Sequence, residues 1–147
     1  YKVGGTHRHT GEIEQELSFL AAKHGLKPVP PISFTPHLVP MSRGILASCY
    51  AKLAKPLNTE SAAVEFKGFY AGQPLVSVVA APPSTKHTVG SARCHLFPVV
   101  DERTGRISVF SALDNLGKGM ATQAIQNMNL MFGLNQATGL EGGAQWP

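Results

Sequence analysis

A run rich in proline, from Lys27 to Pro40, constrains the fold of this 147-residue chain more than any other feature. The run contains five prolines. Proline has no backbone N–H to donate and its ring holds φ near about −65°, so the run cannot be helical. We expect an extended, irregular segment here, with regular structure before and after it.

The residues before the proline run predict one helix, from about Gly11 to His24. Ile13, Leu17 and Leu20 recur at the spacing of one helical face. Glutamates near its start favour the positive end of the helix dipole, and Gly25 is a natural residue at which such a helix ends.

The residues after the proline run predict strands interrupted by helices. Two helices are expected, one capped by Asn58 or Thr59 and running to about Lys67, and one from Leu116 to Phe132. This order predicts an α+β fold, with a mainly antiparallel mixed sheet and helices on one face. The four expected strands are Ile45–Leu53, where the alanines leave a helix open, Pro74–Ala80, Arg93–Val100 and Arg106–Leu113.

Two further predictions concern the end of the chain. A methionine stripe formed by Met120, Met128 and Met131 in the last expected helix is most simply explained as core packing. The Gly-rich tail from Asn135 to Pro147 is expected to be loose.

Composition excludes several classes of protein. Charged residues make up 15% of the chain, where about 25% is usual, which suggests that another chain or domain covers part of the surface. The net charge of +4 is scattered, without the Lys/Arg run of a nucleic-acid-binding arm. No apolar run is long enough to span a membrane. Two cysteines cannot form a disulfide scaffold, so a reducing, cytoplasmic compartment is expected. Residue 1 is Tyr rather than Met, so we expect a chain cut from something longer.

The densest cluster of reactive side chains is His7-Arg8-His9. Histidine titrates near neutral pH and can act as a general base, while the planar fork of Arg suits a carboxylate or phosphate. Glu12 lies three residues after His9 and can orient an imidazole. A solvated helix entrance explains the same residues. His-x-His can also offer two metal ligands, but no third ligand stands at a supporting spacing, so no metal is predicted.

Two further segments can attract anions. Arg43 can hold an anion and Ser42 can add a hydroxyl, although a turn with an exposed Arg explains them as well. Gly117-Lys118-Gly119 opens the last expected helix, where backbone N–H groups attract phosphate. Asp114 and Asn115 just before it can serve simply as a helix cap.

The two cysteines and the glycine pattern give negative results. Cys49 and Cys94 lie in apolar strand patterns without a feature that would lower a thiol pKa, so we interpret both as structural. No Gly-x-Gly-x-x-Gly follows a strand, so the chain shows no dinucleotide-binding unit of its own.

Five longer stretches occur together in this chain: VGGTHRHTGEIEQEL from Val3, FTPHLVPMSRGILAS from Phe34, FYAGQPLV from Phe69, TVGSARC from Thr88 and LDNLGKGMATQAIQNMNLMFGL from Leu113. In this order they resemble the C-terminal part of the N-acetyl-gamma-glutamyl-phosphate reductases. The resemblance covers nearly the whole chain, to about Leu140, and several long motifs in order make it specific.

This resemblance implies an enzyme of arginine biosynthesis that uses NADPH to reduce an acyl phosphate to an aldehyde, with release of phosphate. In that family a Cys thiolate forms a thioester with the substrate, and hydride from the nicotinamide then reduces it. The Cys belongs to a Pro-Gly-Cys-Phe/Tyr motif upstream of His-Arg-His, as does the NADP-binding domain, and neither is present here. Residues 1–147 are then a substrate-binding and dimerisation domain, similar in fold to the C-terminal domain of glyceraldehyde-3-phosphate dehydrogenase-like reductases. Alone it would be inactive, and its partners would be its own N-terminal half and further copies in a dimer or tetramer.

The resemblance also implies roles for individual residues. His7 matches the acid/base partner of the Cys. The substrate-binding candidates are Arg8, His9 and Arg43, with Ser42 beside Arg43, Glu12 steadying the histidines and Tyr1 bordering the pocket. Asp114 and Asn115 match the motif that approaches the nicotinamide, with Lys118 close by, while NADP(H) would be bound mainly by the missing domain. The last helix would pack back on that domain.

Two alternatives remain. One is a related reductase of lysine biosynthesis that acts on a carrier-bound aminoadipyl phosphate. Such a carrier is acidic, and a net charge of +4 supports it weakly. The other is a dimerisation or binding module without catalysis.

Overall fold

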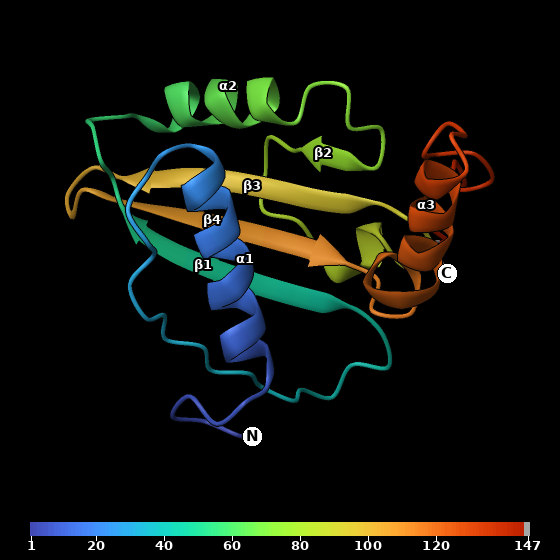
Figure 1. The fold of residues 1–147 in the computed structure, drawn as a ribbon, viewed down its shortest axis with the longest axis horizontal. Helices are drawn as coiled ribbons and strands as arrows, with labels where there is room; N and C mark the ends of the chain where they lie inside the picture. Colours follow the sequence, from blue (N-terminus) through green and yellow to red (C-terminus); the bar gives the residue numbers. More distant parts are fainter. Residues whose placement is uncertain (146–147) are drawn as a thin grey trace. The chain divides into compact units, whose positions relative to one another are not determined.

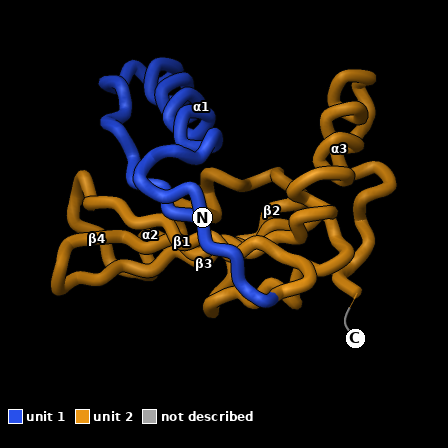
Figure 2. The backbone as a smooth tube through the Cα atoms, turned by 90° about the horizontal axis from the view of Figure 1, so that it is seen from below, with its two compact units in different colours: residues 1–40 blue, residues 41–147 orange. Residues whose placement is uncertain are grey.

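The computed structural model describes residues 1–145 and divides into two compact units, which Figure 2 shows in different colours. Unit 1 comprises residues 1–40 and unit 2 begins at Met41. The boundary therefore falls directly after Pro40, the last proline of the proline-rich run.

Unit 1 consists of one helix and the extended proline run. Helix α1 (His9–Lys23) confirms the helix expected before the run. The run itself has no helix or strand, as its prolines require. The backbone N–H of Ile32 donates to the Glu14 carboxylate at 2.9 Å, which ties the run to the helix.

Unit 2 is built on a four-stranded sheet with the order β1-β4-β3-β2 (Figure 1). Its central strand β4 is antiparallel to both neighbours, whereas β2 is parallel to β3. The expected α+β fold with a mainly antiparallel mixed sheet is thus confirmed, and the strand interpretation holds for the alanine-containing segment. The strands are β1 (Ile45–Lys52), β2 (Val76–Val78), β3 (Cys94–Asp101) and β4 (Arg106–Leu113).

Helix α2 (Thr59–Phe69) packs on β2 and β3. It begins with a reciprocal cap, in which Asn58 Oδ1 accepts the backbone N–H of Ser61 at 2.8 Å. The Thr59 hydroxyl oxygen accepts the backbone N–H of Val100 at 3.0 Å and joins the start of the helix to β3. The cap predicted at Asn58 is confirmed.

The tail after Asn135 is not loose along its whole length. Ala137 and Leu140 are buried in one cluster with Leu75 and Ala92. Burial of these apolar side chains away from water stabilises the packing of the tail on Leu75 and Ala92. The expectation of a loose tail is therefore wrong for this part. The last two residues of that tail, Trp146 and Pro147, lie outside the described residues.

The last helix begins differently from the expectation. Residues Gly117–Ala121 form a π-helical turn, and α3 (Thr122–Met131) follows it. In the π turn the N–H of Gly119 donates to the carbonyl of Asp114, five residues earlier, at 2.9 Å. Such turns often occur at functional sites. Figure 1 shows α3 beyond the end of the sheet at which β4 finishes.

The methionine stripe of this helix is not core. Met131 is 83% exposed, whereas Asn129 on another face is 2% exposed. Polar contacts decide this orientation, because the Asn129 amide donates to the carbonyl oxygens of Gln136 and Thr138. The core-packing interpretation is wrong, and an apolar face is left exposed. Among residues 1–145 no helix has the length and apolar character needed to cross a bilayer.

Candidate functional site

The residues singled out from the sequence fall into two groups, one in each unit. Unit 1 contains the histidine cluster, made of Tyr1, His7, Arg8, His9 and Glu12. Unit 2 contains the Asp114 cluster, made of Ser42, Arg43, Asp114, Asn115 and Lys118.

His7 is the buried centre of the histidine cluster. Its ring meets those of Tyr1 and Phe34 edge to face, with centroids 5.4 Å away in each case. The backbone N–H of His9 donates to His7 Nδ1 at 3.2 Å, and the Tyr1 hydroxyl lies 3.1 Å from Nε2. The backbone N–H of His9 thus satisfies Nδ1, and Nε2 has the Tyr1 hydroxyl as its partner.

Burial lowers the pKa of His7 below its usual 6.5, and the positive charges of His9, Lys2 and Arg8 lower it further. Glu12 opposes them but does not reverse the direction. The imidazole is therefore neutral at pH 7 and has the protonation state of a base.

Helix α1 positions the rest of the histidine cluster. His9 and Glu12 are three residues apart on its first turn and make an ion pair through His9 Nδ1. The hydrogen bond from His9 is the main reason why the pKa of Glu12 is lowered. Arg8 is exposed at the start of α1, with its guanidinium open to solvent. The cluster thus places a neutral imidazole beside a free cationic fork.

Asp114 is the buried centre of the second cluster, with 0% of its surface exposed. Arg43 donates to both of its carboxylate oxygens, from Nη2 at 2.6 Å and from Nε at 3.3 Å. Burial alone would raise the pKa of Asp114, but hydrogen bonds from the backbone of Gly90, Leu116 and Gly117 and from Arg43 outweigh it and lower the pKa. Asp114 is therefore ionised at neutral pH, and all of its acceptor capacity is used by the protein.

Asn115 and Lys118 differ in whether their side-chain nitrogen has a hydrogen-bond partner. Asn115 Oδ1 accepts the backbone N–H of Gly44 at 2.7 Å, while its amide nitrogen meets no acceptor among the described residues. Lys118 Nζ donates to Gln126 at 2.5 Å, and burial lowers its pKa. Ser42 is exposed in the bend before Arg43.

The contacts of Asp114 decide whether the segment Gly117-Lys118-Gly119 can bind phosphate through backbone N–H groups. The backbone N–H groups of Leu116 and Gly117, which would receive a phosphate, point to the Asp114 carboxylate instead. These N–H groups are thus occupied by a carboxylate of the chain itself. Asp114 is not the N-cap residue, however, because the turn begins after Leu116 and has no side-chain cap.

Reasoning from the sequence missed two contributors. Phe34, from the proline run, packs on His7. Gly90 donates its backbone N–H to Asp114 at 2.5 Å, from a turn whose Thr88 and Ser91 are also buried. The stretch TVGSARC was recognisable as a motif, but nothing in the sequence indicated that Gly90 would donate to Asp114.

The two cysteines form no disulfide, with Cys49 exposed on β1 and Cys94 half-buried on β3. Cys94 Sγ lies 3.4 Å from the Ser111 hydroxyl on the neighbouring strand. Across residues 1–145 no three His, Cys, Asp or Glu side chains are grouped so as to hold a metal ion.

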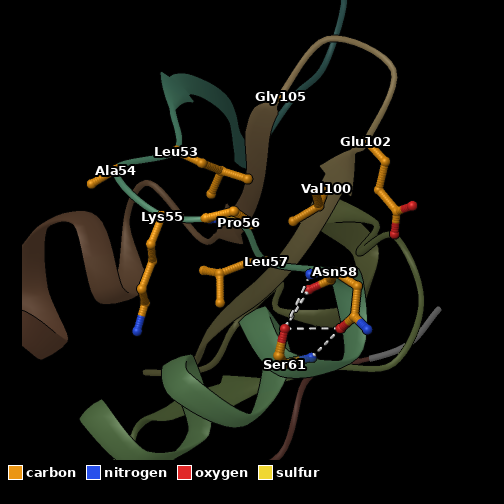
Figure 3. Close-up of a pocket in the computed structure, with 10 residues that line it drawn as sticks. All are labelled: Leu53, Ala54, Lys55, Pro56, Leu57, Asn58, Ser61, Val100, Glu102 and Gly105. Carbon is orange, nitrogen blue, oxygen red and sulfur yellow. Dashed lines mark hydrogen bonds between the residues drawn. The ribbon is translucent and has the colours of Figure 1, made fainter.

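A cavity of about 780 Å³ lies elsewhere in unit 2 and includes none of the residues of the two clusters (Figure 3). It is formed by Leu53–Asn58 after β1 and by the β3–β4 hairpin, including Glu102 and Gly105. The register of β1 on β4 pairs Lys52 with Arg106 at this end and Ile45 with Leu113 at the other. At roughly 3.4 Å per residue the cavity is about 24 Å from Asp114 along the sheet.

Comparison with known proteins gives a consistent result. Residues 1–115 match the family model described as semialdehyde dehydrogenase, dimerisation domain. The chain is 52% identical to an N-acetyl-gamma-glutamyl-phosphate reductase of Geobacter sulfurreducens, over 100% of this chain and 42% of the relative. The identity is 48% with the protein of that name from Thermus thermophilus, over 100% of this chain and 44% of the relative. For the one from Symbiobacterium thermophilum it is 54%, over 95% and 39%. The chain thus spans about two fifths of the length of these relatives.

Proposed function

Because the chain belongs to the semialdehyde dehydrogenase dimerisation-domain family, we propose that it is the substrate-binding and dimerisation part of an N-acetyl-gamma-glutamyl-phosphate reductase. The name of its relatives and their roughly 50% identity over the full chain support this proposal. The NADP-binding half and the nucleophilic Cys would lie in a further segment, since the relatives are more than twice as long.

The proposed reaction converts N-acetylglutamyl 5-phosphate to N-acetylglutamate 5-semialdehyde and phosphate. A thiolate of the further segment attacks the acyl carbon, the bond from that carbon to the phosphate oxygen breaks, and phosphate leaves with the electron pair. NADPH supplies the hydride that reduces the resulting thioester. The thiolate then departs, and the aldehyde remains.

His7 is the residue on which this proposal depends most. The family resemblance assigns it the acid/base role, and its lowered pKa supports that role, because only a neutral imidazole can take the proton of a thiol. Phe34 and the backbone N–H of His9 hold the His7 ring in place, so the ring needs little reorientation when substrate binds.

The anionic groups of the substrate would be bound by arginines. Arg8 and His9 lie beside His7, Glu12 steadies His9 through its ion pair, and Tyr1 meets His7 Nε2. We also propose Arg43, with Ser42 beside it, as a binding residue for an anionic group of the substrate. Each guanidinium offers the fork that a carboxylate or phosphate matches.

Cofactor contacts from this chain would be few. The free amide nitrogen of Asn115 suits the carboxamide oxygen of a nicotinamide, and Lys118 adds a positive charge nearby. The carboxylate of Asp114, in contrast, is enclosed by protein donors. NADP(H) itself would be bound mainly by the further segment.

Two exposed apolar surfaces support further partners. The exposed apolar face of α3, which includes Met128, Met131 and Phe132, would pack on the NADP-binding half. Edge strand β1, with exposed Leu46 and Tyr50, suits assembly with a second copy. The unpaired Cys49 and Cys94 agree with a reducing, cytoplasmic setting.

The decisive experiment runs the reaction backwards. NADPH formation from N-acetylglutamate 5-semialdehyde, NADP and phosphate is followed with this chain alone and then with the upstream segment added. We expect no NADPH from the chain alone and steady formation on mixing. Activity of the chain alone would make Cys49 or Cys94 a nucleophile, and absence of activity in both would contradict the proposed function.

The acid side of the pH profile tests the state of His7. Turnover needs neutral His7, and turnover falls as the pH drops through its pKa, so we expect the acid limb of kcat/KM below 6.5. Lys2→Met removes one of the charges that lower this pKa, and should move the limb upward with an unchanged plateau. A limb above 6.5 in the unsubstituted protein would contradict the assignment.

A further inference from the structure

Arg43 and Asp114 are 71 positions apart in the sequence, yet they form the most enclosed ion pair of the described residues. The Asp114 side chain is fully buried, whereas that of Arg43 is 37% exposed. The pair therefore has a fixed inner end and an outer end that reaches the surface.

The contacts leave one edge of the guanidinium free. Nε and Nη2 donate to Asp114, while Nη1 meets no acceptor among residues 1–145. A guanidinium is planar and its five N–H groups have fixed directions. Holding two of its nitrogens on one carboxylate therefore fixes where the Nη1 edge points.

The backbone below Arg43 is held as well. The N–H of Gly44 donates to Asn115 Oδ1, the residue next to Asp114. Gly44 has φ +111, and a Cβ there would come within 2.7 Å of Thr85 Cβ, so the turn allows no ordinary side chain. The adjacent pair Asp114-Asn115 thus anchors both the side chain of Arg43 and the backbone that follows it.

The carboxylate does not simply neutralise the arginine. It also accepts the backbone N–H groups of Gly90, at 2.5 Å, and Leu116, at 2.9 Å. These dipoles take up part of its negative charge, so the guanidinium keeps attraction for a second anion on its free edge.

We propose that Asp114 is a positioning residue, which holds Arg43 so that its free Nη1 edge receives the carboxylate or phosphate of the substrate. This inference rests on the proposed function and deepens it, because it assigns Asp114 to the substrate's charge through Arg43 rather than to direct contact with the cofactor.

The test uses the complete protein in the reverse direction, in which phosphate and the semialdehyde carboxylate are separate substrates with separate KM values. Arg43→Gln and Asp114→Asn should each raise one of these two KM values at least tenfold, with kcat changed less than threefold. Phosphate or semialdehyde as the affected substrate shows which anion Arg43 receives. The double variant should be no worse than Arg43→Gln alone, because Asp114 acts through Arg43.

Two control variants distinguish a positioning role from a purely structural one. Asp101→Asn removes another carboxylate that accepts backbone N–H groups and pairs with an Arg, Arg103, and should leave both KM values unchanged. Arg43→Lys keeps the charge but not the fork, so it should resemble Arg43→Gln, and this variant leaves the buried carboxylate in place should Asp114→Asn fold poorly. Wild-type KM values in Arg43→Lys would overturn the inference, as would multiplying effects in the double variant.

The inference and the proposed function fail differently. No turnover in the unsubstituted complete protein would contradict the proposed function, and with it this inference. Normal turnover with KM values indifferent to Arg43→Gln would contradict the inference alone.

Discussion

Replacing His7 with Asn in the complete protein should lower kcat by about 10²- to 10⁴-fold, the range that general acid–base catalysis contributes. Asn has nearly the same reach as His and can still accept the backbone N–H of His9, which now goes to His7 Nδ1 at 3.2 Å. It cannot exchange a proton near neutral pH. The KM of the acyl substrate should change little, since its anionic groups are assigned to arginines.

The matched control for this prediction is His37→Asn. His37 lies in the same unit, is exposed, and its Nδ1 lies 3.1 Å from the carbonyl oxygen of Thr35. Its removal should leave kcat within about twofold. Initial rates at saturating substrate measure both variants. A drop of less than tenfold for His7→Asn, in a protein that unfolds at the normal temperature, would refute the assignment of His7.

Replacing Gly117 with Ala should destabilise unit 2 by about 3 kcal/mol, the upper end of the usual cost of overpacking. A Cβ at this position would come within 3.0 Å of the backbone carbonyl oxygen of Ser91, a separation that real Cβ atoms essentially never show. Its next neighbours would be the Cβ and Cγ of Asp114, at 3.3 and 3.4 Å. Since the closest atom belongs to the backbone, no side-chain rotation relieves the contact.

Gly68→Ala is the control for Gly117→Ala. Gly68 lies inside α2, and a Cβ there meets nothing within 4 Å. Because Ala loses less backbone freedom than Gly in a helix, this substitution should stabilise by about 0.5–1 kcal/mol. Urea unfolding followed by far-UV circular dichroism gives both values. Equal midpoints for Gly117→Ala and the unsubstituted protein would show that the turn relaxes around the new methyl group.

The elements that the sequence predicted correctly are those whose cause is local. The prolines exclude a helix in their run whatever surrounds it. Asn58 caps α2 through Ser61, which lies only three residues later. Strands β3 and β4 pair as a hairpin because a short loop joins them. The histidine cluster is local too, because His7, His9 and Glu12 lie on one helix entrance. Its candidates were therefore recognisable from spacing.

The wrong predictions concern which face of a helix is buried and which residues that face contacts. Helical spacing shows that Met128 and Met131 share a side of α3, but not which side is buried. That was decided by Gln126 and Asn129, whose amides bind Gln136 and the following turn. The same contacts hold part of the tail that its glycines had suggested would be loose.

The sequence by itself therefore determined the helix before the proline run, the helix capped by Asn58 and the strands, because each depends on residues close together in the chain. The whole chain was expected to form one domain, so the boundary between the two units came from the structure. His7 as the acid/base candidate came from the family resemblance and stays a prediction. Only the tertiary structure decided that Asp114 is enclosed and holds Arg43. Three segments, at Arg43, Gly90 and Leu116, meet at its carboxylate. A buried charge must find its partners wherever the fold brings them, and no spacing along the chain records that meeting.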